Sequence, residues 1–581
     1  MMTNEQMDVW TCGRVDVWTW VRSITPLPSY LLALVLLPAV AFAQPDTERL
    51  PDLTPRAFEI RGDLQISLPN LERQPLRGFA PPPRTYVVPG SRQTYVAPYG
   101  QDIDGLPVDP LAEPVPPDAA ALSPLTGRID AGFGRYLSRL GRLTVSAGGL
   151  GVNASYSGFS NFQPFDDEPD FDARSDVFDG RIAYTTPGPT RFGFALDGDY
   201  QQYRLLGADV PNVVDAQPDR TGRTIGGSVS VASDAPDRVP FHAAARFAST
   251  DYSVNVEDGV FDFGVPEGSF DQTEARFEAD GGVRFDRVRV DAAGAFSGLG
   301  DEGIGESLKT YSAGGTVQLT VGRGVLDVGA RFLGYSASAL NGGGSSQNVG
   351  PVVSFDLPLS STTRFYIRNE PSVVRRGLAG LFRANPYAVP EPFVAPDLHV
   401  VDGDAGLEIQ SRNVRFTAYA GGRYSPVALH FVRNISGATV GLYDTRYAEE
   451  VVLRGGGSVT FYAPNGLRAT LGAEFRSGTL PDTEQDIPYF APFVGELSLA
   501  MPFAEGRGLV QVTGSAESAR PREAPLDEAP AWATLDAEAH YLFSPGVGAL
   551  VRAERLAGRA EQWPGYPRPP SAVLAGLRVQ W

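Results

Sequence analysis

Histidines are the residues of this sequence best suited to bind a metal or to move a proton near neutral pH. The chain has only four, His242, His399, His430 and His540, and none lies four residues from another. An HExxH motif is also absent, so the spacing that places two imidazoles on one helical face does not occur. Each histidine is therefore interpreted as a residue of a loop or of a solvated interior, and no metal site is predicted.

One histidine has acidic neighbours at the spacing of a strand face. His540 alternates with Asp536 and Glu538, so in an extended strand the three side chains point the same way. The group suggests proton chemistry of the kind used by barrel hydrolases. No matching nucleophile and no second acidic pair accompany it. The sequence therefore predicts no catalytic and no cofactor-binding residue, and the chain is not expected to be an enzyme.

An acidic segment and the overall charge bear on other ligands. The segment lacks the glycine and the ligand order of an EF-hand, so a solvated loop is preferred to a calcium site. A net charge of −19 argues against binding nucleic acid through a basic surface. No phosphate-binding glycine loop and no G-x-S-x-G motif occurs. The acidic residues are Asp166, Asp167, Glu168, Asp170, Asp172 and Asp176.

From Ile129 to the last residue the hydrophobic pattern has a period of two, which is typical of strands with one apolar face. Phe192, Phe194 and Leu196, for example, alternate with smaller or polar residues. The same alternation recurs in segments 288–296, 326–332, 467–476 and 534–541. No helical periodicity is visible in this region. Any functional side chain of this region is therefore expected to be positioned by strands and their loops.

Alternation also occurs in soluble sandwiches, so the choice of a membrane barrel rests on three further features. The predicted strands are long, about 10 to 15 residues, which suits a tilted bilayer crossing. Charged residues follow most of the polar face, as a wet lumen requires, and short connections alternate with long polar ones. We therefore predict an all-β fold, a large antiparallel transmembrane β-barrel of about 20 strands within a range of about 16 to 22.

The strand count leaves one segment unassigned. About twenty strands run from Arg142 to Trp581, an even number with both ends on the side of the short turns. Residues 129–138 also have the pattern of a strand, but the short connection 139–141 follows them and breaks the parity. They are either an extra strand or a piece packed inside the lumen. Short turns are assigned to the periplasm, and long loops such as 370–397 are assigned to the outside. External loops such as 370–397 are also expected to fold in and to narrow the pore, while residues 44–124 leave through the periplasmic mouth.

The last strand carries the most specific local signal. Its apolar residues share one face, and the chain ends on an aromatic residue. Such an ending resembles the signal read by the bacterial barrel-assembly machinery, which is therefore an expected partner together with outer-membrane lipid. The residues are Val573, Ala575, Leu577, Val579 and Trp581.

The N-terminal part of the chain has a different composition. Residues 31–43 are apolar, follow Arg22, and end in small residues before Gln44, so residues 1–43 are predicted to be a signal peptide. The only cysteine, Cys12, lies within it, which excludes disulfides from the exported chain. Residues 44–125 are rich in proline and have no sustained period, so a periplasmic tether is expected. The alternative is a docking strip for a periplasmic protein, bound by residues 44–124.

Residues 126–581, the predicted barrel, resemble the barrel of TonB-dependent outer-membrane receptors, especially plug-less relatives from Bacteroidetes-like bacteria. The resemblance rests on the Asn385-Pro386-Tyr387 and Pro390-Glu391 motifs, on DAGLEI at 404–409, and on the closing strands. It implies a barrel in the outer membrane that takes up a ligand. A plug domain of this family is not recognisable before residue 126, and energy coupling is therefore not predicted.

These features lead to two expectations of function from different classes. The first is passive or gated transport of a small solute, because a barrel of about twenty strands is too wide for inward side chains to fill. The second is an envelope anchor whose N-terminal tract recruits a periplasmic protein. A barrel enzyme that uses His540 is the least favoured hypothesis. The sequence names neither the solute nor a ligand of the loops.

Overall fold

The computed structural model describes the chain from Leu125 onward with gaps. The signal peptide and almost all of the tether predicted above lie outside the described residues, as does most of the acidic segment near 166–176. The described residues are 125–162, 173–205, 219–233, 240–255, 268–285, 288–301, 307–337, 344–389, 392–435, 441–523, 526, 528–556, 563 and 571–581.

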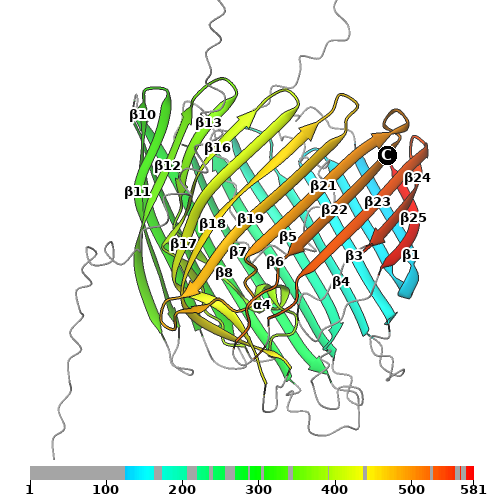
Figure 1. Cartoon of the computed structure of the whole chain (residues 1–581), viewed down its shortest axis with the longest axis horizontal. Coiled ribbons are helices and arrows are strands. Elements are labelled where there is room, and N and C mark those ends of the chain that lie inside the picture. The colour runs from blue at the N-terminus through cyan, green and yellow to red at the C-terminus, as the bar shows by residue number, and fades with distance from the viewer. Residues whose placement is uncertain are drawn as a thin grey trace, which may run out of the picture. The chain divides into compact units, whose positions relative to one another are not determined.

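Twenty-two long antiparallel strands form one closed barrel, which confirms the predicted fold class (Figure 1). The barrel closes where β25 (Ala572–Gln580) pairs with β1 (Thr126–Gly134). The other wall strands are β2 (Arg139–Ala147), β3 (Leu150–Phe162), β4 (Ala173–Thr185), β5 (Thr190–Arg204), β6 (Asp219–Ser233), β7 (Phe241–Asn255), β8 (Gly268–Phe285), β9 (Val288–Asp301), β10 (Ser307–Val321), β11 (Gly324–Ala337), β12 (Ser345–Pro358), β13 (Thr363–Asn369), β16 (Val401–Gln410), β17 (Val414–Arg433), β18 (Tyr443–Tyr462), β19 (Arg468–Leu480), β21 (Phe493–Phe503), β22 (Gly508–Glu517), β23 (Trp532–Ser544) and β24 (Val547–Glu554).

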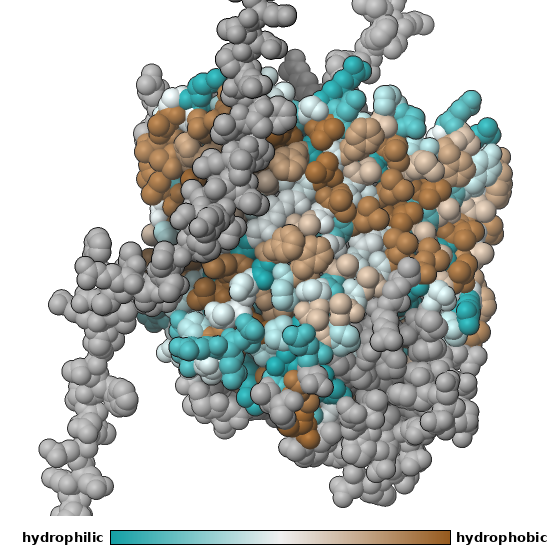
Figure 2. Space-filling view, viewed as in Figure 1, coloured by the Kyte–Doolittle hydropathy of each residue, from teal (hydrophilic) through white to brown (hydrophobic). Residues whose placement is uncertain are grey.

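The outer face of the wall is apolar, as the alternating pattern predicts. Phe192, Phe194 and Leu196 on β5 are 49%, 52% and 64% exposed, whereas Ala195 between them is buried. Figure 2 shows hydrophobic side chains gathered over the part of this face near the short turns, with hydrophilic ones below them. Exposed aromatic and aliphatic side chains on a closed barrel are stable only against lipid, so this surface is the membrane-facing belt. The barrel is accordingly an outer-membrane β-barrel.

The segment that broke the predicted parity is a wall strand. Residues 129–134 belong to β1, which pairs with both β2 and β25. The interpretation of this segment as an extra strand is therefore confirmed, and packing inside the lumen is wrong. The parity failed because the β1–β2 connection is short, with a 3-10 turn at Arg135–Leu137, although it lies at the end of the long loops. A short connection is thus no proof of the side on which it lies.

Two ends of the barrel differ in their connections, and we name them the turn end and the loop end. The turn end carries Trp581, the start of β1, and tight turns such as Gly148-Gly149, where φ is +51° and +94°. Such left-handed backbone favours glycine, which explains the residue types at that turn. The loop end carries longer connections, several of them only partly described. The connection between β17 and β18 is one of the shorter ones, because β17 continues to Arg433 and β18 begins at Tyr443.

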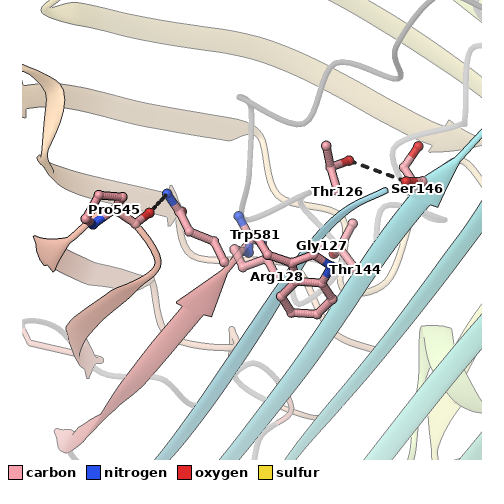
Figure 3. Close-up of a pocket in the computed structure, with 8 residues that line it drawn as sticks. Thr126, Gly127, Arg128, Thr144, Ser146, Pro545 and Trp581 are labelled. Carbon is pink, nitrogen blue, oxygen red and sulfur yellow. Dashed lines mark hydrogen bonds between the residues drawn. The ribbon is translucent and has the colours of Figure 1, made fainter. Parts of the chain in front are cut away.

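The seam between β1 and β25 is held on both faces of the wall. On the lumen side Arg578 donates two hydrogen bonds to the Asp130 carboxylate, at 2.7 and 2.9 Å, and both side chains are buried. Gly127 and Trp581 exchange backbone hydrogen bonds of 3.0 Å, and a side chain at Gly127 would collide with the Trp581 ring. A pocket of about 340 Å³ lies beside this pair and is lined also by Arg128. Figure 3 shows the residues that line it. The predicted closing strand is therefore confirmed.

Three short strands and one helix do not belong to the wall. These are β14 (Ser372–Val374), α4 (Leu378–Ala384), β15 (Asp397–His399) and β20 (Gln485–Asp486). The helix corrects the expectation that this region has no helical element. No helix in the described part of the chain is long and apolar enough to cross a membrane.

A charge on the lipid face tests the membrane-facing belt. We expect Leu471→Arg on β19 to lower the yield of folded barrel sharply, because an arginine near mid-membrane costs about 2–4 kcal/mol. The matched control is Thr470→Arg, whose side chain points into the lumen and contacts Thr460 at 3.1 Å. Heat-modifiable migration in gels and the midpoint of urea unfolding measure the effect. Equal folding of the two variants would show that the faces have been assigned wrongly.

Candidate functional site

A folded segment lies between β13 and β16, at the loop end of the barrel. This segment, residues 370–400, is called the lumen segment below; it contains β14, α4 and β15. Figure 1 shows α4 between the strands near that end. Leu381 and Leu398 are completely buried, and Phe382 is 1% exposed. The segment is therefore packed against the barrel rather than displayed as a surface loop.

The local sequence explains the short helix. Leu378, Leu381 and Phe382 follow the i, i+3, i+4 spacing and form one apolar face. The helix ends at Ala384 because Pro386 disfavours helical backbone at Asn385, where φ is −141° and ψ is 101°. Seven residues are too few for a stable isolated helix, so α4 depends on its contacts with the wall.

Arg220 on β6 binds one side of the lumen segment. Its guanidinium donates hydrogen bonds to the backbone oxygens of Pro386 and Ala388 at 2.8 and 2.7 Å. The same group lies 4.2 Å from the centre of the Phe382 ring, which Tyr252 on β7 also contacts. Arg220 is 1% exposed, so these contacts are made away from water, where charged hydrogen bonds are strong.

Side chains from three further wall strands, β8, β10 and β11, also hydrogen-bond to the lumen segment. Gln272 on β8 accepts a hydrogen bond from the backbone N–H of Leu378 at 2.8 Å, at the start of α4. Thr310 on β10 accepts one from Nε of Arg375 at 2.8 Å. Arg331 on β11 donates to the backbone oxygen of Pro371, also at 2.8 Å. The segment is thus fixed along the wall from β6 to β11.

The other side of the lumen segment is fixed to β17 and β18. Leu398 pairs with Val427 on β17, next to a bulge in that strand. Val389 donates a backbone hydrogen bond of 2.9 Å to Tyr443 on β18. Eight wall strands, β7 to β13 and β16, separate β6 from β17 on the shorter way round the barrel. A segment that contacts both β6 and β17 therefore crosses the lumen.

A buried ion pair stabilises the far side of the segment. Arg376 donates from Nε and Nη2 to one oxygen of Asp397 at 3.0 and 2.7 Å. The other oxygen of Asp397 accepts a hydrogen bond from the backbone N–H of Leu429 at 2.9 Å. Burial alone would raise the pKa of Asp397, but Arg376 and this hydrogen bond outweigh it, and the net shift is downward. Asp397 therefore stays ionised and links the segment to β17.

Two of the four histidines belong to this buried region. His399 on β15 lies 3.7 Å from Asp402, which is paired with Arg454 at 2.8 Å. Burial lowers the pKa of His399 to about 3, with Arg423 as the next cause. His430 on β17 is 4% exposed and lies near Glu450 on β18. The structure thus brings together two histidines that are far apart in sequence: His399 lies within the lumen segment, and His430 lies on the neighbouring strand β17.

Aromatic side chains from β17, β18 and two loops pack together against the lumen segment. Trp563 contacts Tyr443, Tyr489 and Phe431, with ring centres 4.8, 5.5 and 5.5 Å apart. Together with the apolar face of α4 these residues form the largest buried hydrophobic cluster of the described chain. The core of the molecule therefore sits at the loop end, inside the barrel mouth.

The remaining residues considered as sites have structural partners. His540 shares the lumen face of β23 with Glu538, which accepts hydrogen bonds from Arg142 at 2.9 and 3.1 Å and one from Arg578 at 3.4 Å. Asp536 accepts a hydrogen bond from the backbone of Arg555. Glu538 thus takes part in ion pairs near the seam, and Asp536 binds the backbone just after β24.

The other two sequence candidates are likewise separate from the lumen segment. His242 lies near the turn end and contacts Asp280 at 3.3 Å. Asp176, the described member of the acidic segment, pairs with Arg139 and Tyr156. No group of three or more metal-ligating side chains occurs in the described ranges.

Sequence reasoning missed Arg220, Arg376 and Asp397, the residues that fix the lumen segment. An arginine on the polar face of a strand looks like every other lumen arginine. The usable signal was the Asn385-Pro386-Tyr387 motif, because the structure places its backbone where Arg220 donates hydrogen bonds. The motif therefore marks the point at which the segment meets the wall.

Removing the contacts of Arg220 tests how the lumen segment is held. Arg220→Ala should lower the local stability of the lumen segment by about 3 kcal/mol, since two charged hydrogen bonds and a cation–π contact are lost. Trypsin should then cut the folded barrel at arginines of the segment on the order of 100-fold faster. The control is Arg246→Ala, which removes a lumen arginine paired with Asp197 at 3.0 Å and touches no part of the segment. Equal rates of cutting in both variants would show that Arg220 does not hold the lumen segment in place.

The buried histidine gives a second test. A pKa near 3, below the ordinary 6.5, means that folding favours neutral His399. The resulting stability is complete above pH 6.5 and is lost as the pH falls toward 3, by up to about 1.4 kcal/mol per pH unit. Proton NMR should show one histidine ring, absent from His399→Gln, that titrates well below pH 5. Titration of that ring near pH 6.5 would show that the segment does not bury it.

Comparison with known proteins places the fold. No protein-family model matches the chain, and no curated protein matches it in sequence. Solved structures do match. The copper transporter OprC has a TM-score of 0.59 at 11% identity, over 80% of this chain and 81% of that one. The FrpB iron transporter from Neisseria meningitidis has 0.59 at 11%, over 79% and 82%.

A third match is BauA, the ferric preacinetobactin receptor from Acinetobacter baumannii, with a TM-score of 0.56 at 13% identity, over 79% of this chain and 80% of that one. Identities this low show a shared fold and nothing finer. The neighbours are TonB-dependent receptors with a large closed barrel, so the resemblance seen in the sequence is confirmed at the level of the barrel. A Bacteroidetes-like origin and a plug-less form remain predictions.

Proposed function

We propose that this protein passes a small solute across the outer membrane through its barrel, and that the lumen segment is the gate. A wall of 22 strands encloses more space than inward side chains can fill. Such a barrel either conducts or is closed by another part of the chain. In the described chain the element that crosses the mouth is the lumen segment.

The observation that carries the proposal is how the segment is attached. It leaves the wall after Asn369 on β13 and returns at Val401 on β16, and these strands are direct neighbours, with Asn369 opposite Gly403. The wall therefore stays closed whatever the segment does. Besides the apolar contacts of α4, its attachments to β6 and β17 include the hydrogen bonds donated by Arg220 and by the backbone of Leu429, which water and a solute can replace. A segment with these properties can move without unfolding the barrel.

The structural neighbours support transport as the class of function. Two of them are named as transporters, of copper and of iron, and one as a receptor for ferric preacinetobactin. Those names describe those proteins, and their cargo is not transferred to this chain. The shared fold favours passage of a solute over an anchoring role. The anchor hypothesis depends on residues 44–124, which lie outside the described residues, and it stays a prediction.

We further propose that the loop end faces the outside of the cell and the turn end faces the periplasm. Short periplasmic turns and long external loops are the rule for bacterial barrels. The lumen segment then closes the external mouth, where an arriving solute meets it first. A gate in this position admits a solute by giving up wall contacts in exchange for contacts with the solute.

Shortening the gate tests the proposal. Residues 371–400 should be replaced by four Gly and Ser residues, which is enough to join the neighbouring ends of β13 and β16. In planar bilayers we expect the intact protein to open rarely, and the shortened barrel to show large, steady conductance. Removal of residues 44–124 alone should leave the conductance of the intact protein unchanged. A barrel that opens widely only after removal of 44–124 would contradict the proposed gate.

A further inference from the structure

A cluster of charged residues lies on the outer face of β2 to β7, at the loop-end border of the membrane-facing belt. Strand alternation fixes its position. Arg223 lies two residues from Ile225, which is 65% exposed, and Asp176 lies two residues from Phe178, which is 41% exposed. Both therefore share the lipid face with those apolar residues. We call the cluster the outer arginine patch; it consists of Arg139, Arg174, Arg204, Arg223, Asp176, Asp219 and Asp251, and it is bordered by Asp271 on β8, which lies opposite Asp251.

Each arginine of the patch is positioned by a carboxylate. Arg139 pairs with Asp176 at 2.9 Å, and Arg223 pairs with Asp251 at 2.8 Å. Asp219 pairs with Arg174 and also with Arg204. These pairs hold the guanidinium groups at fixed heights above the apolar belt. An arginine held in this way loses less freedom when it binds a further anion.

The arginines remain open to a ligand after pairing. The side chains of Arg139, Arg174 and Arg223 are 39%, 36% and 64% exposed. A guanidinium has five N–H donors, and one carboxylate does not use them all. The exposed edges therefore keep donors at the level where lipid head groups begin. Phosphate oxygens are the acceptors that match this planar, charged donor best.

The patch occupies one sector of the wall and not a full ring. On β9 to β11 the outer positions near the loop end carry no arginine in the described residues, and Lys309 is the one cation among them. Arginines that only contact bulk lipid head groups would be expected all round the barrel. A local cluster therefore indicates a specific ligand. The residues at those positions are Gly298, Gly300, Lys309, Tyr311, Gly334 and Ser336.

We propose that the outer arginine patch binds the phosphate groups of a phosphorylated glycolipid in the surrounding leaflet. The exposed apolar side chains directly below the patch, among them Ile225 and Phe178, then contact its acyl chains. The ligand is identified by this pairing of phosphate above and hydrocarbon below, at one depth of the membrane. The inference rests on the orientation proposed above, with the loop end outward, and it does not need the lumen segment to be a gate.

Binding to purified protein tests the proposal directly. The probes are a bisphosphorylated glucosamine glycolipid and its dephosphorylated counterpart, each titrated into the full-length protein in neutral detergent. We expect the intact protein to bind the phosphorylated probe at least tenfold more tightly. The variant Arg139→Gln/Arg174→Gln/Arg223→Gln should lose at least tenfold in affinity for it. All variants are first checked for heat-modifiable migration, and the single variant Arg223→Gln is used if the triple variant does not fold.

The matched control removes three arginines of the inner wall with similar exposure. Arg364, Arg368 and Arg415 have side chains that are 42%, 51% and 51% exposed. Their replacement by Gln should leave glycolipid affinity unchanged. Equal affinity of the intact protein and the outer variant, or equal affinity for both probes, would overturn the proposal. So would displacement of the glycolipid by inorganic phosphate at equal concentration, because the ligand would then be the free anion.

Conductance and glycolipid affinity test the proposed function and this inference separately. The outer variant should keep the conductance of the intact protein, because the patch lies outside the lumen. Failure of the gate experiment would leave glycolipid binding as it is. Retention of full glycolipid affinity by the outer variant would refute the patch alone.

Discussion

Closure of the sheet is the constraint on which the rest of this structure depends. A strand edge in hydrocarbon would leave backbone N–H and C=O groups without partners, at a cost of several kcal/mol for each group. Pairing of β1 with β25 removes that edge, and the buried Arg578–Asp130 pair fixes its register from the lumen side. Closure then determines everything inside the wall. A sheet of 22 strands must enclose a wide lumen, so a part of the chain has to close it or leave it open.

The lumen segment is the part of the described chain that closes the lumen, and it does so with few contacts. Wall residues such as Arg220 and Gln272 satisfy its backbone groups, and a few apolar side chains of α4 pack against aromatic residues of the wall and loops. Because its two ends return to neighbouring strands, the closure of the mouth is separable from the closure of the wall. This separation makes a gated pore physically reasonable in a barrel that must never open along its seam.

The sequence carried most information about the wall and least about its interior. Phe192, Phe194 and Leu196 identified the lipid face because alternation directly reflects the two sides of a strand. The closing strand was recognisable from its apolar face and from Trp581. The strand β1 was ambiguous, because the short β1–β2 connection lies at the loop end, against the usual rule.

The interior contacts could not be predicted, since they join residues far apart in the chain. Helix α4 spans seven residues, too few to show a period among strands. Arg220 and Asp397 look like ordinary polar residues until the fold brings them to Ala388 and Leu429. Two features pointed to this region: the length of the loop 370–397, which was expected to fold in, and the Asn385-Pro386-Tyr387 motif, which did so through a family resemblance. Neither gave the contacts themselves.

The central claim is that residues 370–400 are folded across the lumen. Hydrogen–deuterium exchange of the intact protein in detergent tests it most directly. The account predicts slow exchange for amides bonded within or across the segment, such as Leu381, Asn385 and Val389, at rates within about tenfold of neighbouring wall strands. Exchange of these amides at the rate of an unstructured peptide, while β13 and β16 stay protected, would contradict it.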